Sequence, residues 1–255
     1  MSPSLSPVLS CFCIWTTCYY MLCMLNHEKS SEFNCRIVTI IHGVFSCILC
    51  SYCGFIVGPW PFDALGEQNT PLQTLCIVVT LGYFMFDFLW CVLKQTEGID
   101  MLLHHITSLC GLCLSMYLEH SGSELVATIF GSEISNPCLQ MRWFLRYAGK
   151  YNTHIAKLND ILFIALFLVI RIGLGSQLLH CTLFSSKSHI LIKLGGTSLY
   201  TISLVWMIFI LMFARKRFFG KKSTWIWNHR LTKNSGNLGT IIKRVALMER
   251  FILRK

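Results

Sequence analysis

The sequence predicts an all-α protein, a polytopic bundle in which about seven helices cross a membrane. Of its 255 residues, 54% are hydrophobic and only 13% are charged, whereas a soluble domain is about a quarter charged. The mean hydropathy is +0.56. Seven segments have roughly the 20 mostly apolar residues that a spanning helix needs. They are 4–25, 35–57, 72–94, 99–118, 124–145, 157–182 and 188–214.

The first segment, 4–25, has no basic start and no clear cleavage site. We therefore expect a membrane anchor there rather than a signal peptide. After the second segment, the residues Gly58-Pro59-Trp60-Pro61 predict a turn and not a domain linker.

The fifth segment, 124–145, is the least apolar. Pro137 cannot donate a helical hydrogen bond, so the carbonyl group of Glu133 is left free. A polar, proline-broken helix is tolerated at membrane depth where it is buried in protein or lines a cavity. The polar residues in its middle are Ser132, Glu133, Ser135, Asn136 and Pro137.

Charge supports keeping this fifth span, because cytoplasmic loops collect Lys and Arg. With the basic C-terminal tail in the cytoplasm, seven spans place the segment after the fifth one on the cytoplasmic side. The connections 58–71 and 119–123 then face the opposite side and hold no Lys or Arg. The cytoplasmic segment carries Arg142, Arg146, Lys150 and Lys157. The N-terminus is expected outside or in the lumen.

The tail is the strongly charged part of the chain. From Arg215 to Lys255 there are twelve Lys and Arg residues and one acid, Glu249, whereas the remaining residues have a net charge of −1. Two interpretations stay open: a basic amphipathic helix on an anionic leaflet, or a solvated tail. The helical interpretation rests on Trp225, Trp227, Ile241, Ile242, Val245, Met248 and Ile252 among basic residues.

Polar residues in three spans fall at one depth. At about 1.5 Å per residue, Asp87 lies about 22 Å and His104 about 21 Å from the lumenal ends of their spans. Tyr83 precedes Asp87 by one helical turn, and in the fifth span the same depth falls near Asn136 to Gln140. We therefore expect these groups in the cytoplasmic third of the membrane.

The adjacent pair His104 and His105 is the main catalytic candidate, because ionisable residues inside a membrane are usually functional. His104 shares a helix face with Thr107, Ser108 and Gly111. One histidine could carry a proton, with Asp87 or Glu133 orienting its ring. Alternatively, both could be interhelical hydrogen-bonding groups.

Two further groups are candidates for lipid contact. Glu133 and Arg171 fall at comparable depths, so they predict either a buried ion pair or a carboxylate that faces a lipid headgroup. Arg142 and Trp143 predict an interfacial anchor, or a site for the phosphate of a lipid or of coenzyme A. With Tyr83, Ser135 and Asn136, these residues complete the candidate lipid-binding set.

No metal site and no cofactor are expected. Most of the 14 cysteines lie in apolar runs, where they are most simply small buried thiols. The carboxylate and loop context of a zinc site is missing, and adjacent histidines lack the spacing of a two-histidine metal site. Cys23, Cys35 and Cys181 lie near span ends and are palmitoylation candidates.

The order of four motifs resembles the TLC family (TRAM, LAG1 and CLN8 homology). The motifs are Gly-Tyr-Phe-Met-Phe-Asp at 82–87, His-His-Ile-Thr at 104–107, Ser-Glu-Ile-Ser-Asn-Pro at 132–137 and Met-Arg-Trp-Phe-Leu at 141–145. The resemblance implies an N-terminal span at 1–29, a TLC domain at 30–217 with a six-helix barrel, and a basic cytoplasmic tail at 218–255.

The family's best-known members, the ceramide synthases, join a fatty acyl group from acyl-CoA to a sphingoid amine. The resemblance carries their His-His pair onto His104 and His105. Their later His-Asp pair has no counterpart, because residues 129–137 read Ile-Phe-Gly-Ser-Glu-Ile-Ser-Asn-Pro. Glu133 could replace the acid, but nothing replaces the histidine. Other branches with a similar variant look like regulators of membrane phospholipid composition.

Three functions follow for the sequence. The first is a lipid-binding TLC protein that influences membrane lipid composition without catalysis. The second is an acyl-CoA-dependent acyltransferase that uses His104 or His105, with acyl-CoA as a substrate. The third, a transporter or channel, ranks last because paired broken helices are missing. Membrane lipids are the expected partners, nucleic acid is not, and the resemblance implies the endoplasmic reticulum, with the plasma membrane as the other location.

Overall fold

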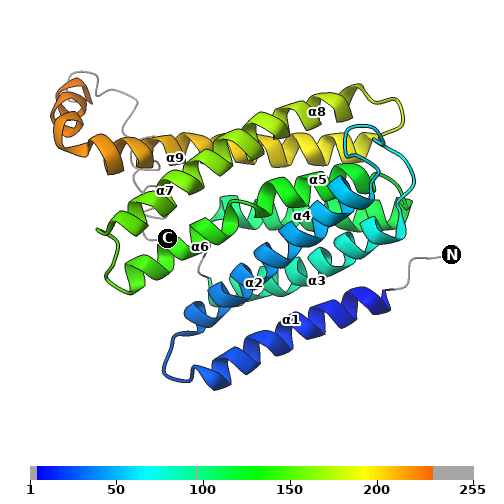
Figure 1. Ribbon diagram of the computed structural model, residues 1–255, viewed down its shortest axis with the longest axis horizontal. Coiled ribbons are helices and arrows are strands. Elements are labelled where there is room, and N and C mark those ends of the chain that lie inside the picture. The colour runs from blue at the N-terminus through cyan, green and yellow to red at the C-terminus, as the bar shows by residue number, and fades with distance from the viewer. Residues whose placement is uncertain (1–4, 96, 232–255) are drawn as a thin grey trace.

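The computed structural model describes residues 5–95 and 97–231, and this part of the chain is helical without a named β-strand (Figure 1). The predicted all-α class is therefore confirmed. Two short π-helical segments, η1 and η2, continue the helices before them. The elements are α1 (Ser6–Leu25), α2 (Ser31–Ser51), η1 (Tyr52–Val57), α3 (Pro71–Lys94), α4 (Ile99–Leu118), α5 (Gly122–Glu133), α6 (Asn136–Tyr147), α7 (His154–Leu166), η2 (Phe167–Leu174), α8 (Gly175–Phe184) and α9 (Ile190–Leu231).

Six helices in the described part are long and apolar enough to cross a membrane. They are Ser6–Leu25, Ser31–Val57, Pro71–Lys94, Ile99–Leu118, His154–Phe184 and Ile190–Phe219. The predicted fifth span instead forms two helices of 12 residues each, α5 and α6, which follow one another along the long axis of the bundle (Figure 1). The predicted fifth span is thus a broken helix, and it is not among the six candidate spans of the described residues.

The break lies where the sequence places its polar residues. The α5 helix ends at Glu133, and α6 begins at Asn136 with Pro137 in its first turn. Proline suits this position because its missing amide hydrogen would have no helical acceptor there. Gly43 of α2 passes close to the break, since a Cβ atom at Gly43 would lie 3.3 Å from Glu133 Oε2 and 3.5 Å from Pro137 Cδ.

Local sequence signals explain where the other helices begin. Thr70 accepts from the backbone of Gln73 while the Gln73 side chain accepts from the Thr70 backbone, which is a complete capping box before α3. Ser30 caps α2 and Thr153 caps α7 in the simpler way. These three caps fix the entry of the chain into three crossings.

One end of the bundle is tied together by hydrogen bonds among its loops. The Glu124 carboxylate accepts from the backbone N–H of Gly66 and from the Ser188 hydroxyl, each at 2.7 Å. The backbone N–H of Ser121 donates to the Glu67 carbonyl at 2.9 Å, and Glu67 also pairs with Lys187. These are the connections that the sequence analysis predicts to lie opposite the basic tail.

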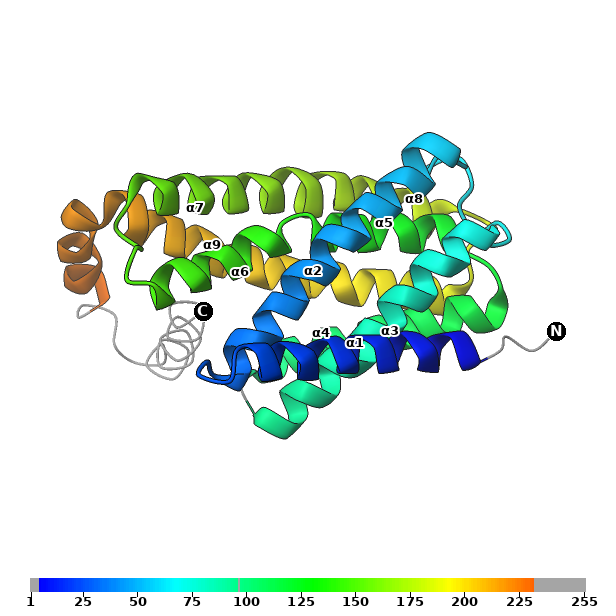
Figure 2. The same ribbon diagram turned by 60° about the horizontal axis from the view of Figure 1, so that its bottom comes forward.

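The additional helix α1 packs mainly on α3, and Figure 2 shows it along the outside of the bundle. The contact is close at Gly82, where a Cβ atom would lie 2.6 Å from Cys11 Cβ and 2.8 Å from Phe12 N. Trp15 and Tyr19 of α1 join Tyr83 and Phe86 in one buried aromatic cluster. Glycine at position 82 therefore permits this helix pair.

The α9 helix is longer than the predicted last span and ends at Leu231. The tail predicted from 218 onward is thus helical as far as 231. The positions Ile241 to Ile252, which carry the prediction of an amphipathic tail helix, lie outside the described residues.

Candidate functional site

Two cavities of different character lie inside the bundle. The larger one, about 350 Å³, is mainly apolar and is bounded chiefly by α4, α5, η2, α8 and α9. The smaller one, about 160 Å³, is bounded chiefly by α2, α3, α4 and α6 and contains most of the buried charged groups. Four residues contribute to the walls of both cavities: Phe84, His104, Ser132 and Arg171.

The polar cavity brings together groups that the sequence analysis placed at one depth. Its lining includes Asp87 from α3, both histidines from α4, and Asn136 and Gln140 from α6. The structure thus brings these groups together in the wall of one cavity. The predicted α4 face is confirmed, because Thr107, Ser108 and Gly111 line the apolar cavity beside His104.

His104 stands at the junction of the two cavities. Its ring lies 5.0 Å from the Trp206 ring, centroid to centroid, and Trp206 is held by a 2.9 Å hydrogen bond to Asp100. Among the residues that the structure describes, none forms a hydrogen bond with His104 Nδ1, although this atom is buried. A buried nitrogen of this kind is suited to a bound polar group.

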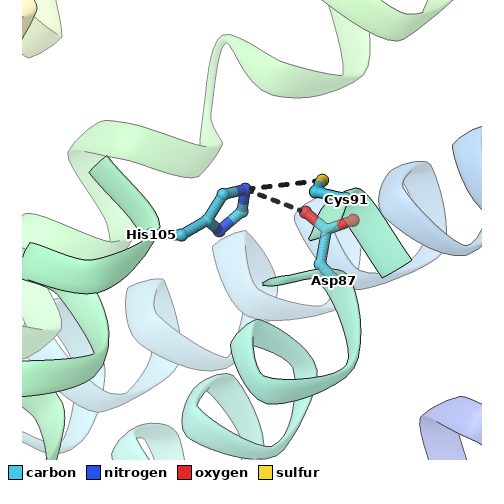
Figure 3. Close-up of side chains that lie close together, drawn as sticks. All are labelled: Asp87, Cys91 and His105. Carbon is cyan, nitrogen blue, oxygen red and sulfur yellow. Dashed lines mark hydrogen bonds and ion pairs between the residues drawn. The ribbon is translucent and has the colours of Figure 1, made fainter. Parts of the chain in front are cut away.

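His105 turns toward α3 instead (Figure 3). Its Nε2 atom lies 3.5 Å from Asp87 Oδ2 and 4.0 Å from Cys91 Sγ. Asp87 in turn accepts a long hydrogen bond of 3.8 Å from the Cys35 thiol of α2. The two histidines therefore differ: one faces the cavities, and the other joins α4 to α3.

Glu133 and Arg171 make no direct ion pair among the contacts of the described residues, although the two buried groups still interact electrostatically. Glu133 accepts a 2.9 Å hydrogen bond from Asn136 and lies 3.8 Å from His42 Nδ1. Arg171 donates to Ser203 at 3.0 Å and to the Ser132 carbonyl at 3.3 Å. The helix break diverts Glu133 because Asn136, one turn later, is the nearer donor.

Arg171 belongs to the π-helical segment η2. Such segments often occur at functional sites because the extra residue in the turn redirects a side chain. Here the guanidinium group lies 5.1 Å from the Trp206 ring centroid and borders both cavities. Arg171 and His104 thus place two nitrogen-bearing groups at the junction.

A Ser-His-Glu arrangement lies beside the polar cavity. Ser46 Oγ is 2.9 Å from His42 Nε2, and His42 Nδ1 is 3.8 Å from the Glu133 carboxylate. The order resembles that of a hydrolytic triad. Neither Ser46 nor His42 lines either cavity, however, and both are almost fully buried. This geometry supports helix packing rather than nucleophilic attack.

Tyr83 contributes both to the packing between helices and to the wall of the polar cavity. Its ring stacks on His42 at 3.6 Å, centroid to centroid, and its hydroxyl donates to Thr39 at 3.1 Å. One edge reaches the polar cavity. Ser135 and Asn136 line that cavity directly.

Arg142 and Trp143 have separate environments although they are adjacent. Arg142 is fully buried, its Nε atom lies 3.6 Å from Asp160 Oδ1, and its guanidinium group covers the Phe213 ring at 3.6 Å. It also borders the polar cavity. Trp143 faces α2, where Arg36 lies 4.8 Å from its ring centroid, and it lines neither cavity.

Several residues at the site were not singled out from the sequence. His42 is one, and its position inside the span 35–57 was a signal, because a histidine there is unusual. Cys91 and Trp206 carried no such signal, since cysteine and tryptophan are ordinary residues of an apolar helix. Arg36 is another, because its 2.7 Å hydrogen bond to Gln140 at the cavity wall depends on a contact between distant helices.

Comparison with known proteins identifies one family. The model of the TLC domain (TRAM, LAG1 and CLN8) matches residues 32–216. Zebrafish (Danio rerio) TLC domain-containing protein 2 is 27% identical over 138 residues, 53% of each chain. Zebrafish TLC domain-containing protein 4-B is 24% identical over 157 residues, 57% of this chain and 56% of that protein.

A third relative comes from Dictyostelium discoideum. Its TLC domain-containing protein 4 A is 24% identical over 152 residues, 58% of each chain. The matched regions thus span just over half the length of these relatives. No solved structure matches the chain.

Proposed function

Because the chain belongs to the TLC domain family, we propose that it is a multi-pass membrane protein that binds a lipid in its two cavities and thereby influences membrane lipid composition. The acyl chain occupies the apolar cavity. The headgroup occupies the polar cavity. The ester, amide or phosphate group that links the acyl chain to the headgroup lies where the two cavities meet. This assignment requires no catalysis.

The observation that carries the proposal is the shared wall of the cavities. An amphiphile needs an apolar space that continues into a polar one, with groups at the boundary that hydrogen-bond its linkage. The apolar cavity, about 350 Å³, falls within the roughly 300–1,000 Å³ typical of small-molecule sites. His104 and Arg171 stand at the boundary and can donate to an ester, amide or phosphate oxygen.

The charge pattern supports an orientation for the site. The polar cavity lies toward the helix ends at Lys94 and Tyr147, beside the segment with Arg146 and Lys150. Basic residues collect on the cytoplasmic side, so we place the headgroup in the cytoplasmic half of the membrane and the C-terminus in the cytoplasm. The endoplasmic reticulum, with the plasma membrane as the other location, remains part of the proposal.

The test is capture of a photoreactive lipid. Gly111 lines the apolar cavity, and a Cβ atom there meets no atom within 4 Å, so Gly111→Leu fills the cavity without a backbone clash. Cys110→Leu adds similar bulk on the same helix but on an exposed position outside the cavity. Cells containing either variant or wild type receive a bifunctional fatty acid, which they incorporate into their lipids, and crosslinked protein is quantified.

We expect wild type and Cys110→Leu to crosslink equally and Gly111→Leu to lose most of the signal. The cellular lipid profile, measured after deletion of the gene and rescue with each variant, should follow the same order. Equal crosslinking of all three proteins would exclude the apolar cavity as the acyl-chain site. An unchanged lipid profile after deletion would remove the proposed effect on composition.

A second candidate, acyl transfer from acyl-CoA, is favoured by the position of His104. In this reaction His104 takes the proton of an acceptor amine or hydroxyl, whose nitrogen or oxygen attacks the thioester carbonyl. The carbon–sulfur bond breaks, and the coenzyme A thiolate leaves and receives the proton. Asp87, 3.5 Å from His105 Nε2, would fix the second histidine, while Glu133 borders the same cavity.

Acyl transfer requires stricter evidence than lipid binding. Transfer of a labelled acyl group to a defined acceptor must be found with purified protein, and His104→Ala must abolish it. Ser46→Ala serves as the control because Ser46 lines neither cavity. Transfer that survives in His104→Ala would exclude this mechanism.

A further inference from the structure

The group Asp87, Cys91 and His105 combines three kinds of metal ligand in one place (Figure 3). Asp87 and Cys91 are four residues apart on α3 and therefore share one helix face, and His105 approaches from α4. The ligand atoms all lie within 4.8 Å of one another. We propose that these three residues form a binding site for a divalent transition metal, with Zn²⁺ as the best fit.

The distances suit a tetrahedral ion. With metal–ligand bonds of about 2.0–2.1 Å to nitrogen, 2.0–2.2 Å to oxygen and 2.3 Å to sulfur, tetrahedral ligands lie about 3.4 Å apart for nitrogen and oxygen and about 3.6 Å apart for nitrogen and sulfur. The structure has 3.5 Å between His105 Nε2 and Asp87 Oδ2, and 4.0 Å between His105 Nε2 and Cys91 Sγ. The thiol has to approach the imidazole nitrogen by roughly 0.4 Å, and the carboxylate and thiol atoms already lie within 4.8 Å of each other.

Charge also favours a divalent cation. When the metal binds, the cysteine is a thiolate, the aspartate is a carboxylate and the histidine is neutral. The two negative charges then cancel those of Zn²⁺, so the site as a whole is neutral. Neutrality matters here because His105 and Cys91 are buried and lie inside candidate membrane spans, where an uncompensated charge is costly.

The choice of metal follows from the ligand types. A thiolate and an imidazole favour zinc over Mg²⁺ or Ca²⁺, which prefer oxygen ligands. Cys35 adds support from α2, because its thiol donates to the other oxygen of Asp87. An outer hydrogen bond of this kind orients a ligand carboxylate.

Three protein ligands leave the fourth position of a tetrahedral ion open, which is the arrangement of catalytic rather than structural zinc sites. All three ligands line the polar cavity, so the open position can take an oxygen atom from a water molecule or from the carbonyl group of a bound amphiphile. With the metal in place, His105 and Asp87 act as ligands, and His104 remains the histidine that faces both cavities.

The experiment uses the full chain, purified in detergent without a polyhistidine tag and exposed to Zn²⁺ or Co²⁺ alone. Zinc per chain is counted by mass spectrometry, and Co²⁺ reports a thiolate ligand through its charge-transfer absorption. The variants are Cys91→Ser and His105→Gln. The matched control is Cys76→Ser, which changes a buried cysteine of the same helix outside the group.

We expect about one zinc per chain in wild type and in Cys76→Ser. Loss of one ligand should weaken zinc binding at least 10- to 100-fold, because removal of outer partners alone already costs that much. The Co²⁺–thiolate absorption should vanish in Cys91→Ser. Size-exclusion profiles show whether a variant loses its zinc only because it aggregates. If the variants aggregate, the Co²⁺ spectrum of the wild-type protein alone decides whether a thiolate binds the metal.

Wild-type protein that binds no Zn²⁺ and shows no Co²⁺–thiolate absorption would overturn the proposal. So would a well-behaved Cys91→Ser variant that keeps its zinc. The measurement involves no lipid, so its outcome is independent of lipid capture.

Discussion

The buried charge cluster around Asp160 offers a direct test of the fold. Asp160 is fully buried, and its two carboxylate oxygens lie 3.6 Å from Arg142 Nε and 3.0 Å from Arg217 Nε. It therefore connects α6, α7 and α9. Asp160→Asn keeps the shape of the side chain but removes the negative charge that faces both guanidinium groups.

Removal of one partner from a buried ion pair costs about 3–5 kcal/mol. A chain of this size loses roughly 2–4 °C of melting temperature per kcal/mol, so Asp160→Asn should melt roughly 6 to 20 °C below wild type. Thermal unfolding in detergent, followed by the fraction that stays monodisperse, measures the shift. Asp63→Asn is the control because Asp63 is exposed on a loop.

A double variant separates lost charge from lost packing. Replacement of a buried ion pair by apolar residues of similar volume is often neutral or stabilising, so Arg142→Met/Asp160→Leu should recover part of the loss. If Asp160→Asn melts within about 2 °C of wild type, a shift below that of 1 kcal/mol, the argument from buried charge is refuted.

Three further predictions concern other parts of the bundle. Gly82→Val should displace α1 from α3 because a Cβ atom would lie 2.8 Å from the backbone nitrogen of Phe12. We expect faster protease cleavage between α1 and α2 in this variant and no change in the control variant Gly111→Ala. Unchanged cleavage of Gly82→Val would contradict the prediction. The Lys187 ammonium group lowers the pKa of Glu67. The stabilisation from this pair is therefore present above the unfolded pKa of about 4.5 and is lost as pH falls through the lower folded pKa. Exchange protection near residue 187, which compares the exchange rate with that of the unfolded chain at the same pH, should fall with acid in wild type but not in Glu67→Gln, and equal pH dependence would disprove the link. Trp206→Phe removes the 2.9 Å hydrogen bond to Asp100 but keeps an aromatic ring beside His104. The photoreactive lipid should therefore still crosslink to the protein, but at other residues. The control variant Trp143→Phe, which lies outside both cavities, should leave the crosslinked residues unchanged.

The sequence predicted most of the fold because membrane spans are encoded locally. Length and apolar content identify each long helix, and the Lys and Arg distribution separates the two ends. The break in the predicted fifth span was predictable for a different reason: Pro137 and its polar neighbours cannot form an ordinary lipid-facing helix. The boundary of α9 was missed because no proline or glycine cap follows residue 214 directly.

The site was predicted less completely. The common depth of Asp87, His104 and Asn136 follows from the helix rise alone, and the structure brings them to one cavity. The depth of a side chain in its helix does not determine, however, which residue of another helix it contacts. Glu133 bonds to Asn136 instead of Arg171 because the break changes its direction, and Cys91 meets His105 only through the packing of α3 on α4.

The broken crossing also constrains how the protein is made. Neither α5 nor α6 has the 20 or so apolar residues that let a helix leave the translocon by itself, and Glu133 at their junction makes release into lipid unfavourable. Residues from α2 already surround this position, with Gly43 against Pro137 and His42 beside Glu133. We therefore expect α5 and α6 to insert only together with the earlier helices, so that the break packs against protein rather than lipid.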